Sequence, residues 1–271
     1  MIYGFFHPGS GLGNQLHRYV ATRVLAKDKE LEFGIIGHKN FKGDSFMKID
    51  MGGEVKLEVS HYDPFGRTML NLSTRPEISS NLFNEKRVVD EFGNDIRGYD
   101  PEFNFVSDNT IIDGEFQDER YFGHRLDDIE EWLKVEDMDL SPDLCVIGFR
   151  GGEFYTDPDL GLPVSYYEDA INRMVLLNPA THFEVHTDDV ETAKHFFPDY
   201  KVIHDIGINW RSMRFATNAI VSNSSFYILP RLLRHNRFPT STITVAPRYW
   251  ARHNTKVWAL PQNYYKSFDY I

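Results

Sequence analysis

Three segments of the sequence combine side chains and backbone groups that suit a phosphate ligand. The first, residues 9–15, places three glycines before a predicted helix. Glycine lets a backbone approach a ligand closely, and the first turn of a helix offers free N–H groups. The segment has neither the Gly-Lys-Ser/Thr of a P-loop nor the dinucleotide Gly-x-Gly-x-x-Gly spacing, so it is either an anion site or a plain turn. Its candidate ligand-binding residues are Gly11, Gly13, Asn14 and Gln15.

The second segment, residues 149–154, presents a cation at the end of a predicted strand. Arg150 follows the strand directly, and Gly151 and Gly152 leave room for a ligand beside it. An arginine at such a place can hold a phosphate with two charge-assisted hydrogen bonds, which makes Arg150 the candidate catalytic cation. The carboxylate of Glu153 either serves as a general base or only orients the turn.

Hydroxyl and carboxylate groups follow two further predicted strands. Serines in residues 222–226 stand at a predicted helix start, where they either cap the helix or bind phosphate oxygens. Asp188 either accepts hydrogen bonds from the N1–H and amino group of a guanine or belongs to the cap of the helix after it. The candidate residues of the serine segment are Asn223, Ser224, Ser225 and Phe226.

Two patterns compete as metal sites. Asp157 and Asp159 form an Asp-x-Asp sequence, a short pattern that arises often in an acidic chain. His182, Glu184 and His186 would share one face of a strand, which is typical of metal ligands and equally of a strand edge with satisfied polar groups. The satisfied edge is the favoured interpretation, so we expect no metal and no other cofactor.

The elements that position these groups alternate between strand and helix. Such alternation predicts an α/β fold with mostly parallel sheets, whose ligands bind at the carboxyl ends of the strands. The acidic residues 134–143 end in Ser-Pro and suggest a boundary, which gives domains 1–140 and 141–271. The predicted strands are 2–6, 144–149, 183–186, 201–204, 219–221 and 243–246, and the predicted helices are 15–27, 121–133, 165–177, 190–197 and 226–234.

Composition narrows the class of protein further. The chain has 271 residues, 41% of them hydrophobic, with a net charge of −11 that argues against nucleic-acid binding. Residues 206–268 nevertheless contain nine basic and no acidic residues, which suits a small polyanion such as a nucleotide diphosphate. Alternatively, the three arginines Arg231, Arg234 and Arg237 only solvate a helix face.

The cysteine content and the lengths of the apolar runs bear on disulfide formation and on location in the cell. A single cysteine, Cys145, excludes an internal disulfide and a thiolate metal cage. Apolar runs are far shorter than the roughly 20 residues that cross a bilayer, and Met1 leads into no basic or apolar leader. We therefore expect a cytoplasmic protein without an integral membrane segment.

Taken in order, several strings resemble the α-1,2-fucosyltransferases of glycosyltransferase family 11. The family's opening Gly-x-Gly-Asn-Gln-Leu corresponds to residues 11–16, and its Gly-Tyr-Trp-Gln-Ser-Glu-Lys-Tyr-Phe to residues 114–122. Its Tyr-Asp-Pro, Leu-Pro-x-x-Tyr-Tyr, Ser-Asp-Asp and Asn-Ser-Ser-Phe correspond to residues 99–101, 162–167, 187–189 and 223–226. The matches span nearly the whole chain in the family's order.

The resemblance implies a GT-B-like fold of two Rossmann-like domains, an acceptor-side N-terminal domain and a C-terminal domain that binds GDP. It implies inverting transfer of fucose from GDP-fucose to an oligosaccharide acceptor, α-1,2 to galactose, with Arg150 on the donor β-phosphate and Asn14 assisting it. The family's His-x-Arg-Arg-Gly-Asp-Tyr is reduced here to residues 148–154, without the histidine and the second arginine. Two alternatives therefore stay open. One is a nucleotide-sugar-binding protein with weakened catalysis, and the other is a transferase that uses another GDP- or UDP-sugar.

Overall fold

The computed structural model describes residues 1–53, 55, 61–62, 68–69, 81–86, 88–93, 95–96, 98–157, 159–179, 182–251, 257–259 and 265–271. The chain divides into two compact units, each with its own parallel sheet. Unit 1 comprises residues 1–44, 48–87 and 97–133, and unit 2 comprises residues 45–47, 88–96 and 134–271. The acidic residues 134–143 lie in unit 2, directly before its first long strand.

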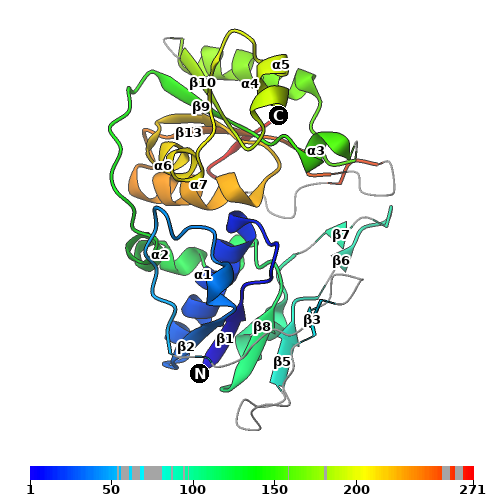
Figure 1. The fold of residues 1–271 in the computed structure, drawn as a ribbon, viewed down its shortest axis with the longest axis vertical. Coiled ribbons are helices and arrows are strands. Elements are labelled where there is room, and N and C mark those ends of the chain that lie inside the picture. Colours follow the sequence, from blue (N-terminus) through cyan, green and yellow to red (C-terminus); the bar gives the residue numbers. More distant parts are fainter. Residues whose placement is uncertain are drawn as a thin grey trace. The chain divides into compact units, whose positions relative to one another are not determined.

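Unit 1 is built on a four-stranded sheet in which every pair of neighbours is parallel, with strand order β2-β1-β8-β5. All four residues of β1 are buried, as expected for a short apolar strand between two neighbours. Helix α1 packs beside β1 (Figure 1). The strands are β1 (Ile2–Phe5), β2 (Phe33–Ile36), β5 (Asn81–Asn84) and β8 (Thr110–Asp113).

Helix α1 (Leu12–Asp28) buries the apolar side chains of Leu16, Val20, Val24 and Leu25, and it begins three residues earlier than predicted. Gly11 is its N-cap residue, so Gly13, Asn14 and Gln15 belong to the helix rather than to the preceding loop. The predicted helix 121–133 is shorter than expected. Its first part is two 3-10 turns, η4 (Glu119–Tyr121) and η5 (Gly123–Arg125), and only α2 (Leu126–Trp132) is α-helical.

Smaller elements complete the first half of the chain. The 3-10 helices η1 and η3 and the antiparallel pair β3 and β4 belong to unit 1, and the antiparallel pair β6 and β7 belongs to unit 2. Their bounds are η1 (His38–Asn40), β3 (His61–Tyr62), β4 (Thr68–Met69), β6 (Val88–Val89), β7 (Asp95–Ile96) and η3 (Pro101–Phe105).

Unit 2 is built on a six-stranded sheet whose neighbours are all parallel, with strand order β11-β10-β9-β12-β13-β14. The fold class is therefore α/β with two mostly parallel sheets, as the sequence predicts. The strands are β9 (Leu144–Phe149), β10 (His182–Thr187), β11 (Lys201–Ile203), β12 (Asn218–Ile220), β13 (Ile243–Ala246) and β14 (Asp269–Tyr270).

Helices cover both faces of this sheet (Figure 1). Alternate residues of β9, such as Cys145 and Ile147, pack in one cluster with side chains of α4 and α5. On the other face, a Cβ at Gly148 would lie 2.8 Å from Met213 of α6 and 2.9 Å from Tyr227 of α7. The helices are α3 (Glu153–Thr156), α4 (Val164–Leu177), α5 (Val190–Phe196), α6 (Ile206–Phe215) and α7 (Ser225–Arg237).

Arg231 corrects the interpretation of the basic residues on α7. Its side chain is completely buried rather than solvating a helix face, and it donates hydrogen bonds within unit 2. Burial and the nearby Arg234 and Arg214 lower the pKa of Arg231 to about 9, which leaves the guanidinium charged at neutral pH. Its acceptors are Oγ1 of Thr244 (2.9 Å) and the carbonyl oxygens of Met213 (3.0 Å), Ala216 (2.7 Å), Thr217 (3.3 Å) and Ile243 (3.0 Å).

Candidate functional site

The strand order of unit 2 reverses direction around β9. From β9 the chain adds β10 and β11 on one side and then returns to β12, β13 and β14 on the other. In open parallel sheets, ligands bind outside the carboxyl ends of the strands at such a point. The register pairs Ile147 of β9 with Ile220 of β12, so Arg150 and residues 222–225 follow neighbouring strands at the same edge.

Arg150 presents its guanidinium at this edge, 28% exposed. Nη1 forms an ion pair with Oδ2 of Asp188, and Nη2 donates to Oε1 of Glu153 at 3.2 Å. The ring of Phe154 lies 5.3 Å from the guanidinium carbon, in the range of a cation–π contact. Three side chains therefore orient a cation that is still open to solvent.

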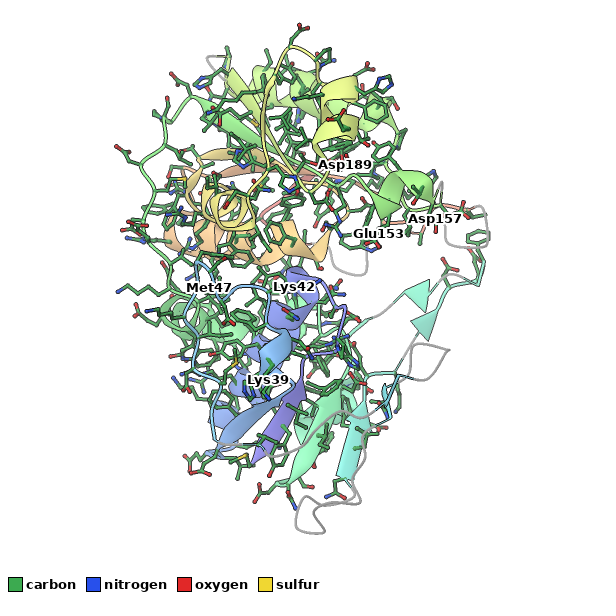
Figure 2. All side chains as sticks on the ribbon, in the orientation of Figure 1. Lys39, Lys42, Met47, Glu153, Asp157 and Asp189 are labelled. Carbon is green, nitrogen blue, oxygen red and sulfur yellow. The ribbon has the colours of Figure 1, made fainter. Side chains whose placement is uncertain are left out.

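Glu153 begins α3, and Figure 2 labels it together with Asp157 and Asp189, all three in unit 2. Its carboxylate is 71% exposed and contacts Arg150 rather than a residue of the sheet. This contact favours the interpretation in which Glu153 orients the turn. Its role as a general base stays a prediction.

The segment after β12 ends at the N-terminus of α7. Ser224 is the N-cap residue, yet its side chain forms no capping hydrogen bond. The first-turn N–H groups of α7 and its positive dipole end therefore suit an anion. Ser224 is 7% exposed, Ser225 begins the helix, and the ring of Phe226 packs edge-on against Trp210, with ring centroids 5.8 Å apart.

Asn223 has a structural role that the sequence does not suggest. Its Nδ2 donates to the carbonyl oxygen of Leu160 at 2.8 Å and to that of Trp250. The side chain is 2% exposed and links the segments that follow β9, β12 and β13. It thus shapes the edge of the sheet, and a direct ligand contact through this amide stays a prediction.

Tyr227 supports the Arg150 turn from inside the unit. Its hydroxyl lies 3.2 Å from the carbonyl oxygen of Phe149 and 3.1 Å from that of His186, the residues near the ends of β9 and β10. The ring fits against Gly148, where a Cβ would come within 2.9 Å of it. No pattern in the sequence marks Tyr227, although it directly follows the serine segment.

In unit 1 the glycine segment lies at the start of α1. Gly11 has φ −66° and ψ 153°, and no side chain caps the helix there. The N–H groups of Gly13 and Asn14 lie in the first turn, which suits an anion. The amide of Gln15 is occupied within unit 1, because Nε2 donates to the carbonyl oxygen of Asn40 (2.7 Å) and Oε1 accepts from the N–H of Lys42 (3.0 Å).

A cluster of polar residues at the carboxyl end of β8 holds this segment. The sequence did not predict that these residues come together. Arg18 of α1 donates to the carbonyl oxygen of Gly114 (2.5 Å), to Oγ of Ser10 (3.2 Å) and to Oε1 of Glu115 (2.7 Å). Asn14 accepts from Nε2 of Gln117 at 3.1 Å. Residues 114–117 thus fix the start of α1.

His7 and Asp113 form a second pair at the same edge of unit 1. Nε2 of His7 lies 2.6 Å from Oδ1 of Asp113, and since a carboxylate only accepts, Nε2 carries the proton. Burial acts to raise the pKa of Asp113, but the hydrogen bond from His7 and the charge of Arg18 outweigh it, and the pKa lies below its usual value. Asp113 is therefore a carboxylate that orients His7.

The two metal-like patterns do not gather ligands in the described residues, where no group of three or more His, Cys, Asp or Glu side chains is placed to hold an ion. His186 bonds to Asn209, with Nδ1 and Oδ1 3.0 Å apart, and Glu184 bonds to Lys201 at 2.8 Å. Asp157 accepts from the N–H of Asp159 at 2.9 Å, and Pro158 between them lies outside the described residues.

Comparison with solved structures finds fucosyltransferases. The structure of NodZ α-1,6-fucosyltransferase soaked with GDP-fucose matches with a TM-score of 0.43 and 13% identity, over 86% of this chain and 91% of that chain. Fucosyltransferase NodZ from Bradyrhizobium matches with a TM-score of 0.44 and 14% identity, over 86% and 92%. No protein-family model and no curated protein sequence matches.

Among the described residues, no helix has the length and apolar character needed to span a bilayer.

Proposed function

We propose that this protein is a glycosyltransferase that transfers fucose from GDP-fucose to a hydroxyl of an oligosaccharide acceptor. The observation that carries the proposal is Arg150, an oriented and partly exposed cation at the carboxyl end of β9. It stands at the point where the strand order of the sheet reverses, and the neighbouring strand leads to a helix start without a side-chain cap. Such an edge suits a diphosphate.

The sequence strings in the order of glycosyltransferase family 11 support the finer parts of the proposal. These are a GT-B arrangement, GDP as the nucleotide, and α-1,2 transfer to galactose. Gly11, Gly13 and Asn14 are proposed donor contacts of unit 1, through the first-turn N–H groups of α1. Ser224 and Ser225 are proposed donor contacts of unit 2.

The proposed reaction is an inverting transfer through an oxocarbenium-like transition state. As the bond from the sugar to the β-phosphate breaks, negative charge builds on the phosphate oxygens. A preoriented guanidinium at that place stabilises the transition state by on the order of 3 kcal/mol. Arg150, with the N–H groups at the start of α7, is the proposed source of this stabilisation, so no divalent metal is needed in the proposal.

A thermal-shift panel of nucleotides and nucleotide sugars tests the donor class. GDP and GDP-fucose at about 100 times their dissociation constant stabilise the folded state by about 2.7 kcal/mol, which corresponds to a rise in Tm of several degrees. UDP, ADP and their sugars are expected to give no shift. A shift with UDP-sugars alone supports the alternative donor, and no shift with any nucleotide contradicts the proposal.

Slow hydrolysis of GDP-fucose separates a transferase from a binding protein before the acceptor is known. The expected result is measurable release of GDP that persists in EDTA. Tight binding of GDP-fucose without hydrolysis supports the alternative of a nucleotide-sugar-binding protein, which the missing histidine and second arginine of the family motif permit. Loss of hydrolysis in EDTA contradicts the metal-independent mechanism.

A further inference from the structure

Two consecutive carboxylates after β10 hold the turn that carries Arg150. Oδ1 of Asp188 accepts from the N–H of Gly151 at 2.9 Å, and Oδ2 of Asp189 accepts from the N–H of Gly152, also at 2.9 Å. The other oxygen of Asp188 forms the ion pair with Arg150. β9 and β10 are paired through their whole length, so these contacts join two neighbouring strand ends.

The two glycines make this approach sterically possible. A Cβ at Gly151 would lie 2.4 Å from Cβ of Asp189, which is too close for any side chain. Gly152 has φ +53° and ψ −121°, a conformation that favours glycine. The contacts with the two carboxylates therefore favour glycine at both positions.

The two aspartates differ in what else they hold. Asp189 caps α5, since its carboxylate accepts from the N–H (3.1 Å) and the hydroxyl (2.6 Å) of Thr192. The hydrogen bonds from Thr192 and Gly152 keep the pKa of Asp189 below its usual value. Among the described residues, the ion pair with the guanidinium of Arg150 comes from Asp188 and not from Asp189.

We propose that Asp188 is a positioning residue for Arg150. It holds Nη1 of the guanidinium and the N–H of Gly151 in fixed places, so that the other guanidinium N–H groups point to a diphosphate. The hydrogen bond to Glu153, at 3.2 Å and on a carboxylate that is 71% exposed, is the one that the phosphate replaces. The proposal rests on the proposed function and replaces the predicted guanine contact of Asp188.

The positioning role and the guanine contact differ in which part of the ligand they serve. A carboxylate that reads guanine through its amino group distinguishes GDP from inosine diphosphate, which lacks this group, and acts independently of Arg150. A carboxylate that orients Arg150 serves the phosphates, acts equally on both nucleotides, and has no effect once the guanidinium is gone. Double-mutant cycles separate a coupled pair from two independent residues.

The experiment measures dissociation constants of GDP and inosine diphosphate by calorimetry for the wild type, D188N, R150A and the double variant. Asn keeps an oxygen acceptor for Gly151 but removes the charge. D188N is expected to weaken both nucleotides by about tenfold in the wild-type background and by less than twofold in the R150A background. A tenfold loss of affinity in both backgrounds overturns the positioning role. So does a result in which D188N weakens GDP but not inosine diphosphate.

D189N is the matched control, because it alters the neighbouring carboxylate without touching Arg150. It is expected to lower Tm through the loss of charge at the α5 cap and to change GDP binding by less than twofold. If D189N weakens GDP as much as D188N does, the turn as a whole matters and the specific role of Asp188 is wrong.

The outcomes also separate this inference from the proposed function. If the wild type binds no guanine nucleotide, both the function and the positioning role fail. If GDP binds and R150A weakens it, but D188N acts independently of R150A, only the positioning role fails.

Discussion

At the scale of single residues, Arg150 contacts two carboxylates, which are negatively charged like the diphosphate proposed as its ligand. Asp188 and Glu153 occupy Nη1 and Nη2 of its guanidinium. A guanidinium has five N–H donors in a rigid fork, so one carboxylate can keep its contact while a phosphate replaces the other. Lysine lacks this fork, which makes the choice of arginine informative.

Replacing Arg150 by Ala is expected to lower the rate of GDP-fucose hydrolysis by 100-fold or more, because one electrostatic donor at a developing charge contributes about that much. Arg150→Lys is expected to recover only a minor part of the rate, since the ammonium group cannot contact Asp188 and a phosphate in the same planar geometry. The measurement is initial GDP release at saturating donor, with Tm recorded for each variant.

Arg173 offers a matched control for this loss. It lies on α4, and its Nε bonds to Oδ2 of Asp269 at 2.6 Å, a partly exposed ion pair comparable with that of Arg150. The R173A substitution removes an ion pair that lies outside the strand-end turn. The variant is expected to hydrolyse GDP-fucose at the wild-type rate. A near-normal rate in R150A, or an equal loss in R173A, would refute the assignment of Arg150.

The sequence places Arg150, Asp188 and Ser224 at one edge because the carboxyl ends of parallel strands meet there. It does not reveal what the amides of Gln15 and Asn223 do. Gln15 bonds to residues 25 and 27 positions away, and Asn223 to residues 63 and 27 positions away. Such long-range partners leave no local pattern in a single sequence, so a structural amide and a ligand-binding amide look alike.

At the scale of elements, most strands and helices of unit 2 follow from periodicity, but α3, β14 and α6 are not predicted, and α6 is the longest of the three. Its buried face has only two large apolar residues, Trp210 and Met213, and the other buried positions are Gly207, Asn209, Ser212 and Arg214, so polar residues interrupt the apolar pattern. Its start is marked instead by Asp205, whose carboxylate accepts from the N–H of Ile208 at 2.7 Å. The predicted helix 121–133 fails at its start for another reason, since Gly123 interrupts the helical pattern.

Arg231 fixes α7 against α6 and the sheet, which predicts a large stability effect. Arg231→Met leaves four buried or partly buried carbonyl oxygens and one hydroxyl without this donor. Each buried acceptor that loses its partner in this way costs about 1–3 kcal/mol. The expected result is a fall in Tm of about 10 °C, measured by thermal unfolding with circular dichroism as the probe.

Arg237 on the same helix is the control for that measurement. Its side chain is exposed, and its guanidinium lies 5.2 Å from the ring of Phe238. R237M is expected to change stability by no more than about 1 kcal/mol, as is usual for surface positions. Equal falls in Tm for R231M and R237M would mean that the buried hydrogen bonds of Arg231 contribute nothing specific.

At the scale of the whole molecule, the charge distribution has two physical origins. The excess of basic residues in 206–268 over an acidic background suits a polyanion, as the sequence suggests. Part of that excess is structural, since the charge of Arg231 is buried against carbonyl oxygens. A count of charges along the sequence cannot separate these contributions, because burial depends on contacts between distant segments.

Three buried histidines make the folded chain sensitive to acid. Burial lowers the pKa of His17 and His186 to about 4 and that of His235 to about 3. Nδ1 of His17 bonds to the carbonyl oxygen of Gly13 and Nδ1 of His186 to Asn209. Among the described residues, Nε2 of His17 and Nε2 of His186 have no hydrogen-bond partner, so the neutral form of these two rings is the one that the folded state accommodates.

The sign of the effect follows from proton binding. An unfolded histidine has a pKa of about 6.5, so between pH 6.5 and 4 the unfolded chain binds more protons than the folded chain. The histidines therefore contribute their full stability above pH 6.5 and lose it as the pH falls toward 4. Each contributes about 1.4 kcal/mol per pH unit within that window.

Thermal unfolding between pH 7.5 and 4.5 tests this prediction, with two variants on the same strand. His186→Gln keeps a donor for Asn209 but cannot be protonated, so the fall of stability with acid is expected to become shallower by about one third, one histidine of three. His182→Gln alters an exposed residue of β10 and is expected to leave the slope unchanged. Slopes are compared rather than Tm values, because the loss of buried imidazole volume in H186Q shifts Tm at every pH. A slope in H186Q equal to that of the wild type would show that burial of His186 does not govern its protonation.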